Sequence, residues 1–211
     1  MTLEIKTFCL GPLENNSFLL WSEDTHDAVV IDPTYEIQAV IEEIHTRKLS
    51  LKEIWITHAH FDHVIGVPLL LQQIEPPPKI GLHPLDLDLW QTDAGAASFN
   101  LHISLPKDPD YFFFNNEIRH LGDNEIEIRH IPGHTPGHVV FYLKQIKLAF
   151  CGDVIFYHSI GRTDLAGGDY ECLEQGIKSQ IFSLPNETRL LCGHGPETSV
   201  EEEKSNNPFL K

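Results

Sequence analysis

Three histidines and an aspartate fall within six residues, in the segment Thr57-His58-Ala59-His60-Phe61-Asp62-His63. The residues just before it, 52–56, form a short apolar and β-branched run that predicts a buried strand. Because neutral imidazole suits zinc and iron, histidines this dense at the end of a strand predict metal ligands on a loop. His58 and His60 can face one ion, and Asp62 and His63 can face a second. A loop of unrelated surface histidines is the alternative interpretation.

Three later segments share a layout in which a glycine directly precedes a histidine or an aspartate at the end of a predicted strand. They are Pro132-Gly133-His134, Cys151-Gly152-Asp153 and Cys192-Gly193-His194. Glycine permits tight turns and close backbone approach, which is useful where a ligand must turn into a shared site. Together with the first cluster, these strand ends would form a site for two cations if they converge at one edge.

Hydrophobic periodicity predicts strands followed by a helix, twice over. Strands are expected at residues 4–10, 17–21, 28–31, 54–57, 79–82, 118–121, 125–130, 139–143, 147–151 and 189–192. Helices are expected at residues 34–48, 67–74 and 170–181, with a short helix from residue 83 and a solvated helix in the acidic tail at 201–204. Because no linker composition separates the two halves, we expect two packed sheets with helices outside, in a single domain spanning residues 1–211.

Residues 91–116 show no clean period. A long irregular segment in a compact domain is often a lid or a binding loop. The alternative is a surface excursion whose aromatic run, residues 111–114, packs on the core.

The formal net charge is −16, from 15 basic and 31 acidic residues. A field of that sign repels phosphate backbones and anionic membranes, and no lysine or arginine cluster offsets it. No apolar run approaches the ~20 residues of a membrane span. We therefore expect a cytoplasmic protein without nucleic-acid or membrane partners, whose four cysteines are free thiols. The oligomeric state is unknown from the sequence.

The motifs His-x-His-x-Asp-His, Pro-Gly-His-Thr-Pro-Gly-His, Gly-Asp and Gly-His-Gly occur in that order over nearly the whole chain. In these motifs the chain resembles the metallo-β-lactamase superfamily. The resemblance implies an α+β fold, an αββα sandwich of two mixed β-sheets with outer helices and metals at one edge. It also implies that one metal is held by His58, His60 and His134, and the other by Asp62, His63 and His194, with Asp153 bridging them.

Within the superfamily, residues 159–169 look like the glyoxalase II-like branch, which hydrolyses thioesters such as acylglutathione. Glyoxalase II has a C-terminal helical domain that helps to bind glutathione, whereas this chain ends soon after His194 and resembles the short bacterial relatives. The resemblance implies two Zn²⁺ ions, with iron or a mixed zinc–iron pair as alternatives. Arg162 is the candidate for contacting an anionic part of a substrate; its alternative role is to fix the loop by bonding to Asp164 or Asp169.

A small-molecule thioester is the expected substrate. Two cations that share Asp153 would also share a water and lower its pKa to about 7. Asp62 is the expected catalytic residue, because it would orient that water as well as bind metal. A thiolate leaving group, with a free cysteine pKa near 8.5, needs no strong general acid.

Other functions compete with this interpretation. A mononuclear iron enzyme similar to persulfide dioxygenases would use His58, His134 and Asp153, and the ligand types do not separate zinc from iron. The complete second ligand set favours two metals. The charge of −16 disfavours a nuclease, and the intact ligand set disfavours a non-enzymatic metal-stabilised protein. The Gly-Arg-Thr-Asp loop favours a substrate other than a β-lactam.

Overall fold

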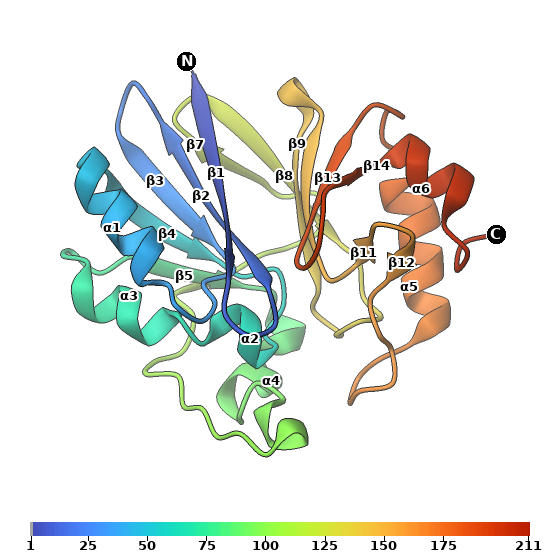
Figure 1. The fold of residues 1–211 in the computed structure, drawn as a ribbon, viewed down its shortest axis with the longest axis horizontal. Coiled ribbons are helices and arrows are strands. Elements are labelled where there is room, and N and C mark those ends of the chain that lie inside the picture. The colour runs from blue at the N-terminus through green and yellow to red at the C-terminus, as the bar shows by residue number, and fades with distance from the viewer. Residues whose placement is uncertain (1) are drawn as a thin grey trace.

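The computed structural model describes residues 2–211 and contains two six-stranded sheets packed face to face. Helices α1 (Gln38–Arg47) and α3 (Val67–Gln73) cover one outer face, while α5 (Tyr170–Gly176) and α6 (Val200–Asn206) cover the other (Figure 1). This arrangement confirms the predicted αββα sandwich. None of the helices formed by residues 2–211 has the length and apolar character that a membrane crossing needs.

The first sheet has the strand order β1-β2-β3-β4-β5-β6. Its strands are β1 (Leu3–Leu10), β2 (Asn15–Ser22), β3 (Asp27–Ile31), β4 (Ser50–Trp55), β5 (Lys79–Leu82) and β6 (Tyr111–Phe112). The β1, β2 and β3 strands are antiparallel neighbours, whereas β3 to β6 run parallel. Because parallel strands end at the same edge, the segments that follow β3 and β4 lie side by side.

The second sheet has the strand order β14-β13-β10-β9-β8-β7. Its strands are β7 (Ile118–Leu121), β8 (Asn124–His130), β9 (Val139–Leu143), β10 (Leu148–Gly152), β13 (Arg189–Cys192) and β14 (Thr198–Ser199). Within it β10 and β13 are parallel, and the other pairs are antiparallel. A separate hairpin is formed by β11 (Ile155–Phe156) and β12 (Ser159–Ile160).

Alternation along the central strands builds three apolar layers. On β2, Phe18 and Leu20 face the core between the sheets, while Leu19 and Trp21 face the core beneath α1 and α3. Successive strand residues point to opposite faces, so a strand segment that packs against apolar cores on both sides carries an unbroken apolar run, as residues 18–21 do. A third core lies between the second sheet and α5, where Leu173 packs.

Most expected elements occur, but their boundaries differ. The α1 helix begins at Gln38 rather than near residue 34, because Glu36 has a left-handed φ of +55° that no α-helix accommodates. Residues Phe61–Val64 form a one-turn helix, α2, where a loop was expected. A short α4 (Leu87–Gln91) follows the 3₁₀ turn Pro84–Asp86, and α5 continues into a π-helical turn, Ile177–Ile181. Asp169 caps α5 by accepting from the backbone N–H of Cys172.

The acidic tail forms the expected helix, α6, and most of its residues face solvent, with one exception. Glu203 on α6 is fully buried. Its carboxylate accepts hydrogen bonds from the Thr198 hydroxyl at 2.6 Å, the Asn207 side chain at 2.7 Å and the backbone N–H of His158 at 3.1 Å. A buried carboxylate is tolerated when donors surround it. Glu203 therefore joins α6 to the turn of the β11–β12 hairpin.

Candidate metal centre

The edge at which the parallel strands β3 and β4 end holds the first histidine cluster. Asp32 directly follows β3, and its carboxylate accepts hydrogen bonds from the backbone N–H of Thr57 at 2.7 Å and the Thr57 hydroxyl at 2.6 Å. These bonds hold the backbone immediately before His58. The chain then turns into α2, which carries Asp62 and His63.

The remaining predicted ligands also follow strand ends. His134 lies in the loop after β8, Asp153 directly follows β10, and His194 comes shortly after β13. Because β10 and β13 are parallel neighbours, Asp153 and His194 leave the second sheet at the same edge. The structure therefore brings all the predicted ligands together, where the two sheets meet near α2 (Figure 1).

His58, His60 and His134 form a first group of buried donors within 4.8 Å of one another. His134 Nε2 lies 2.9 Å from His60 Nδ1 and 3.2 Å from His58 Nε2. Nitrogen ligands of a tetrahedral zinc ion, each at 2.0–2.1 Å, are separated by about 3.3 Å. The geometry of this group therefore fits one cation.

A second group is formed by Asp62, His63 and His194, whose ligand atoms also lie within 4.8 Å of one another. Asp62 Oδ2 lies 3.4 Å from His194 Nε2 and 3.7 Å from His63 Nε2. The carboxylate oxygen and two imidazole nitrogens thus face a common point, which fits a second cation.

Asp153 lies between the two groups. Its Oδ2 is 3.6 Å from His134 Nε2 in the first group and 3.7 Å from His194 Nε2 in the second, and its Oδ1 is 3.4 Å from His63 Nε2. Oδ1 is buried and has no hydrogen-bond partner among residues 2–211. A buried acceptor is normally satisfied, so this orphaned oxygen indicates that the cluster accommodates a cation.

In four of the five candidate ligand histidines, the ring nitrogen that points away from the cluster has a partner of its own. A hydrogen-bonded outer nitrogen fixes the tautomer and aims the other nitrogen inward, as in most metal-binding histidines. The four contacts are His58 Nδ1 with the Thr57 hydroxyl (3.0 Å), His63 Nδ1 with Asp32 (3.1 Å), His134 Nδ1 with the Arg162 carbonyl (2.8 Å) and His194 Nδ1 with the Leu13 carbonyl (2.9 Å). Asp32, which directly follows β3, thus orients His63.

The charge states of Asp62, Asp153 and His60 suit metal binding, whereas at His63 the charges of Asp153 and Asp62 outweigh burial and raise the pKa, so a cation would take the place of its proton. Burial raises the pKa of Asp62, but the charge of His63 and a hydrogen bond with His194 outweigh it and lower that pKa to about 2. The same competition, in which His63 outweighs burial, holds the pKa of Asp153 far below its usual range. Burial and the neighbouring His134 lower the pKa of His60 to about 3. At neutral pH the two carboxylates are therefore ionised and His60 is neutral.

Close packing explains two of the glycines that precede ligands. A Cβ atom on Gly193 would lie 2.2 Å from Asp153 Oδ1, and one on Gly152 would lie 2.5 Å from Thr57 Oγ1. Gly152 also has a φ of +47°. Any side chain at these positions would push the strand ends apart, so the close backbone approach expected from the sequence is a steric requirement of the site.

Two further residues support the ligand loops. Asp86 carries no motif in the sequence, yet its buried carboxylate accepts from Ala59 N–H at 3.0 Å, the Thr135 hydroxyl at 2.8 Å and Gly137 N–H at 2.6 Å. It therefore joins the loop of the first two histidines to the loop of His134. His138 accepts a hydrogen bond from the Asp153 N–H at 3.0 Å.

Asn15 at the start of β2 belongs to the site, although the sequence did not indicate it, because no motif surrounds it. Its side chain is 1% exposed, and Nδ2 donates to Asp62 Oδ2 at 2.8 Å. The same nitrogen lies 3.3 Å from Nε2 of both His63 and His194. Asn15 therefore contacts every member of the second group.

Replacing Asn15 with alanine should weaken the second cation site selectively. The change frees Asp62 to rotate, and loss of a partner that orients a ligand typically costs 10–100-fold in metal affinity. We expect about a tenfold rise in the dissociation constant of the more weakly held metal, measured by competition with a chromophoric chelator. The tighter site should be unchanged. Equal weakening of both sites would contradict this role.

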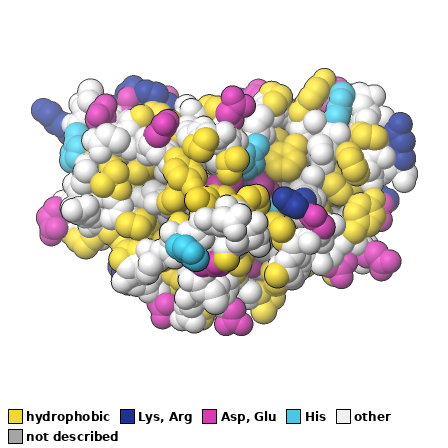
Figure 2. All heavy atoms as spheres, turned by 60° about the horizontal axis from the view of Figure 1, so that its bottom comes forward, with side chains coloured by type: hydrophobic (Ala, Val, Ile, Leu, Met, Phe, Trp, Pro, Cys, Tyr) yellow, Lys and Arg dark blue, Asp and Glu magenta, His cyan; other side chains and the backbone are white. Residues whose placement is uncertain are grey.

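A cavity of about 260 Å³ opens onto the cluster, and Asp62, Asp153 and Arg162 are among its lining residues. Figure 2 shows hydrophobic side chains around a hollow with acidic side chains at its bottom. The Arg162 guanidinium donates from Nε and Nη2 to Asp164 at 2.7 and 2.8 Å. Arg162 thus makes the structural contact with Asp164 and also borders the cavity, so the two expected roles are compatible.

The irregular segment after α4 contributes a wall of this cavity. Phe99, in the 3₁₀ turn Ala96–Phe99, lines the cavity, and its ring lies 5.2 Å from that of Phe61. The aromatic run that follows does not reach the cavity: Phe113 is fully buried in the core between the sheets. One part of the segment therefore lines the cavity, whereas the aromatic run packs on the core only in part, since Phe113 is buried and Phe114 is exposed.

Comparison with known proteins gives a consistent family. A family model described as "Metallo-beta-lactamase superfamily" matches residues 10–194. Hydroxyacylglutathione hydrolase GloC of Haemophilus influenzae is 36% identical over 210 residues, which cover 99% of this chain and 98% of that protein. Two solved structures match across nearly their whole length. BLEG-1 B3 metallo-beta-lactamase has a TM-score of 0.91 and 33% identity, covering 99% of this chain and 100% of that one. TTHA1623 in a di-iron-bound form has a TM-score of 0.86 and 38% identity, covering 97% of this chain and 100% of that one.

Proposed function

This chain belongs to the metallo-β-lactamase superfamily and is a metal-dependent hydrolase, and we propose that it cleaves small-molecule thioesters with two metal ions. The observation that carries the proposal is the position of Asp153, whose carboxylate faces both ligand groups. A mononuclear site would need only the first group and Asp153. The complete second group, with its own orienting partners, supports a pair of cations.

The thioester substrate is supported by similarity to GloC, whose name describes a hydroxyacylglutathione hydrolase, over almost the full length of both chains. It is supported further by Arg162 at the edge of the cavity, where a cation can meet an anionic group of the substrate. Glutathione-type thiols carry such groups, and a thiolate leaves without a strong general acid. Zinc is our proposed metal; imidazole and carboxylate ligands also suit iron.

The chain's own residues have distinct roles in this proposal. The bound cations would supply an activated water at neutral pH and neutralise charge that develops on the carbonyl oxygen. Asp62 borders the cavity as an ionised carboxylate and would accept a hydrogen bond from that water, which orients it toward the substrate. Phe99 and Leu165 narrow the cavity around the reacting carbonyl.

The proposal is tested by measuring metal content and three activities on the same purified protein. We expect two metal ions per chain by elemental analysis and hydrolysis of S-lactoylglutathione that a chelator abolishes and added metal restores. Nitrocefin, a β-lactam, serves as the comparison substrate, because the similar BLEG-1 protein is described as a B3 metallo-beta-lactamase. Thioester hydrolysis that survives complete metal removal would overturn the proposal, as would a single iron with oxygen consumption on a persulfide substrate.

A further inference from the structure

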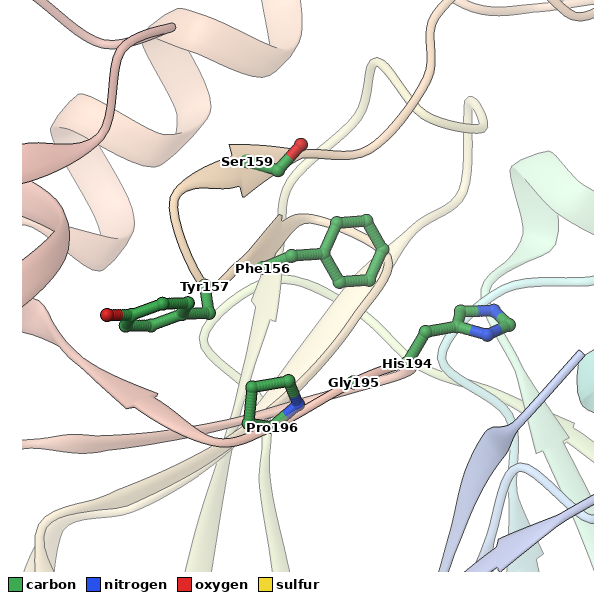
Figure 3. Close-up of a pocket in the computed structure, with 6 residues that line it drawn as sticks. All are labelled: Phe156, Tyr157, Ser159, His194, Gly195 and Pro196. Atoms are coloured by element: carbon green, nitrogen blue, oxygen red, sulfur yellow. The ribbon is translucent and has the colours of Figure 1, made fainter.

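A second cavity, of about 430 Å³, lies on the other side of His194 (Figure 3). It is lined by Phe156, Tyr157, Ser159, His194, Gly195 and Pro196. We call this cavity the hairpin groove, because the β11–β12 hairpin forms one of its walls. His194 lines both the groove and the cavity that contains Asp62 and Asp153, so the groove borders the metal centre directly.

Helix α6 holds the hairpin wall of the groove in place. Tyr157 is 49% exposed, and its ring stacks on that of His158 with centroids 4.0 Å apart. His158 is in turn held by α6. Its ring Nε2 lies 2.7 Å from a Glu202 carboxylate oxygen, and its backbone N–H donates to the buried carboxylate of Glu203. The aromatic ring is therefore presented on a braced turn, and little ordering is needed before a ligand packs on it.

The opposite wall is the loop after β13, which Asn16 holds by donating to the carbonyls of Cys192 at 3.0 Å and Gly195 at 2.9 Å. Gly195 has a φ of +70°, and a Cβ atom built there would meet nothing within 4 Å. The positive φ therefore favours glycine at this wall, although there is space around it.

The two sides of His194 differ in charge. Arg162 borders the cavity on the metal side. Of residues 2–211, those that line the hairpin groove include no aspartate, glutamate, lysine or arginine. Aromatic and proline rings next to a reacting centre favour an apolar group, since burying such a group removes its surface from water. A thioester whose carbonyl lies at the metals would extend one half toward Arg162 and the other half toward the groove.

We propose that the hairpin groove binds the acyl group of the substrate and makes the enzyme prefer apolar acyl groups, of the size of hexanoyl or phenylacetyl, over acetyl or lactoyl. The thiol half, which carries the anionic groups, lies on the Arg162 side. This inference rests on the proposed thioesterase function and adds the acyl specificity of the same site.

The test compares glutathione thioesters that share one thiol and differ in acyl group: acetyl, lactoyl, hexanoyl and phenylacetyl. Each methylene that becomes buried contributes up to about fourfold in binding, and the groove is open on one side. We expect kcat/KM for hexanoyl to exceed that for acetyl by about tenfold or more. In Tyr157→Ala this ratio should fall by about fivefold, and Ser159→Leu, which narrows the groove from the hairpin, should lower it too.

Ile118→Ala is the matched control, because Ile118 is an exposed apolar residue that lines a separate cavity of about 360 Å³. It should leave the hexanoyl-to-acetyl ratio unchanged. Equal kcat/KM values across the series, or a ratio that neither groove variant alters, would overturn the acyl assignment while the thioesterase function stands. Failure to hydrolyse every thioester would overturn the proposed function and this inference with it.

Discussion

An Asp153→Asn variant should fold, lose both metal ions on dialysis, and hydrolyse thioesters about a thousandfold more slowly than the parent protein. Asp153 is the residue that faces both ligand groups, with Oδ2 at 3.6 Å from His134 Nε2 and 3.7 Å from His194 Nε2. Asparagine keeps the size of the side chain but removes the negative charge that offsets two divalent ions. It also offers only one oxygen, where both oxygens of Asp153 face imidazole nitrogens.

The measurement is elemental analysis after dialysis against a weak chelator, alongside kcat/KM and thermal unfolding. Loss of metal with a circular dichroism spectrum like that of the parent protein would separate the metal site from the fold. Retention of two ions per chain together with parent-like kcat/KM would contradict the position assigned to Asp153 between the two cations.

The same chemical change at Asp62 should have a narrower effect. Asp62 contacts only the second group, through His63 and His194, and its carboxylate is held ionised with a pKa of about 2. We therefore expect Asp62→Asn to retain one ion on the three histidines of the first group and to lose the other. We expect kcat to fall by about 10²–10³-fold, because the variant loses both a ligand and the acceptor that orients the attacking water.

The two asparagine variants control for each other, since each removes one negative charge from the same cluster. One ion per chain in Asp62→Asn and none in Asp153→Asn would support the assignment of ligands to the two groups. Loss of both ions in Asp62→Asn would mean that the groups do not fill independently. An Asp62→Asn variant with two ions and unchanged kcat would remove Asp62 from the catalytic role.

The fold and the ligands were largely predictable because their signals are local. Buried strands such as β13 are apolar runs bounded by glycine or charge, and the predicted ligands lie in the segments that follow such runs, with Asp62 and His63 in the short helix α2. The glycine before His194 could be recognised from the sequence, but the reason for it could not. A Cβ atom at this position would lie 2.2 Å from Asp153, which is 40 residues away in the sequence. Helix boundaries were less predictable, since the left-handed residue Glu36 that delays α1 has no sequence signature.

Three of the supporting residues could not be predicted, because their roles depend on which distant segments meet. Asn15, Asp86 and Glu203 are polar residues in ordinary surroundings, and each is buried only because loops or helices from elsewhere close over it. Glu203 was expected in water and instead anchors the hairpin that forms a wall of the groove.

Strand periodicity in the sequence was sufficient to predict two packed sheets with outer helices, because it is a property of short segments. The resemblance of the motifs to the family implied the αββα sandwich and the division of the candidate ligands around Asp153. The tertiary structure alone decided that Asn15 and Asp86 support those residues, and where an apolar groove opens beside His194. Such features depend on distances between segments far apart in the chain, which packing sets and local patterns do not contain.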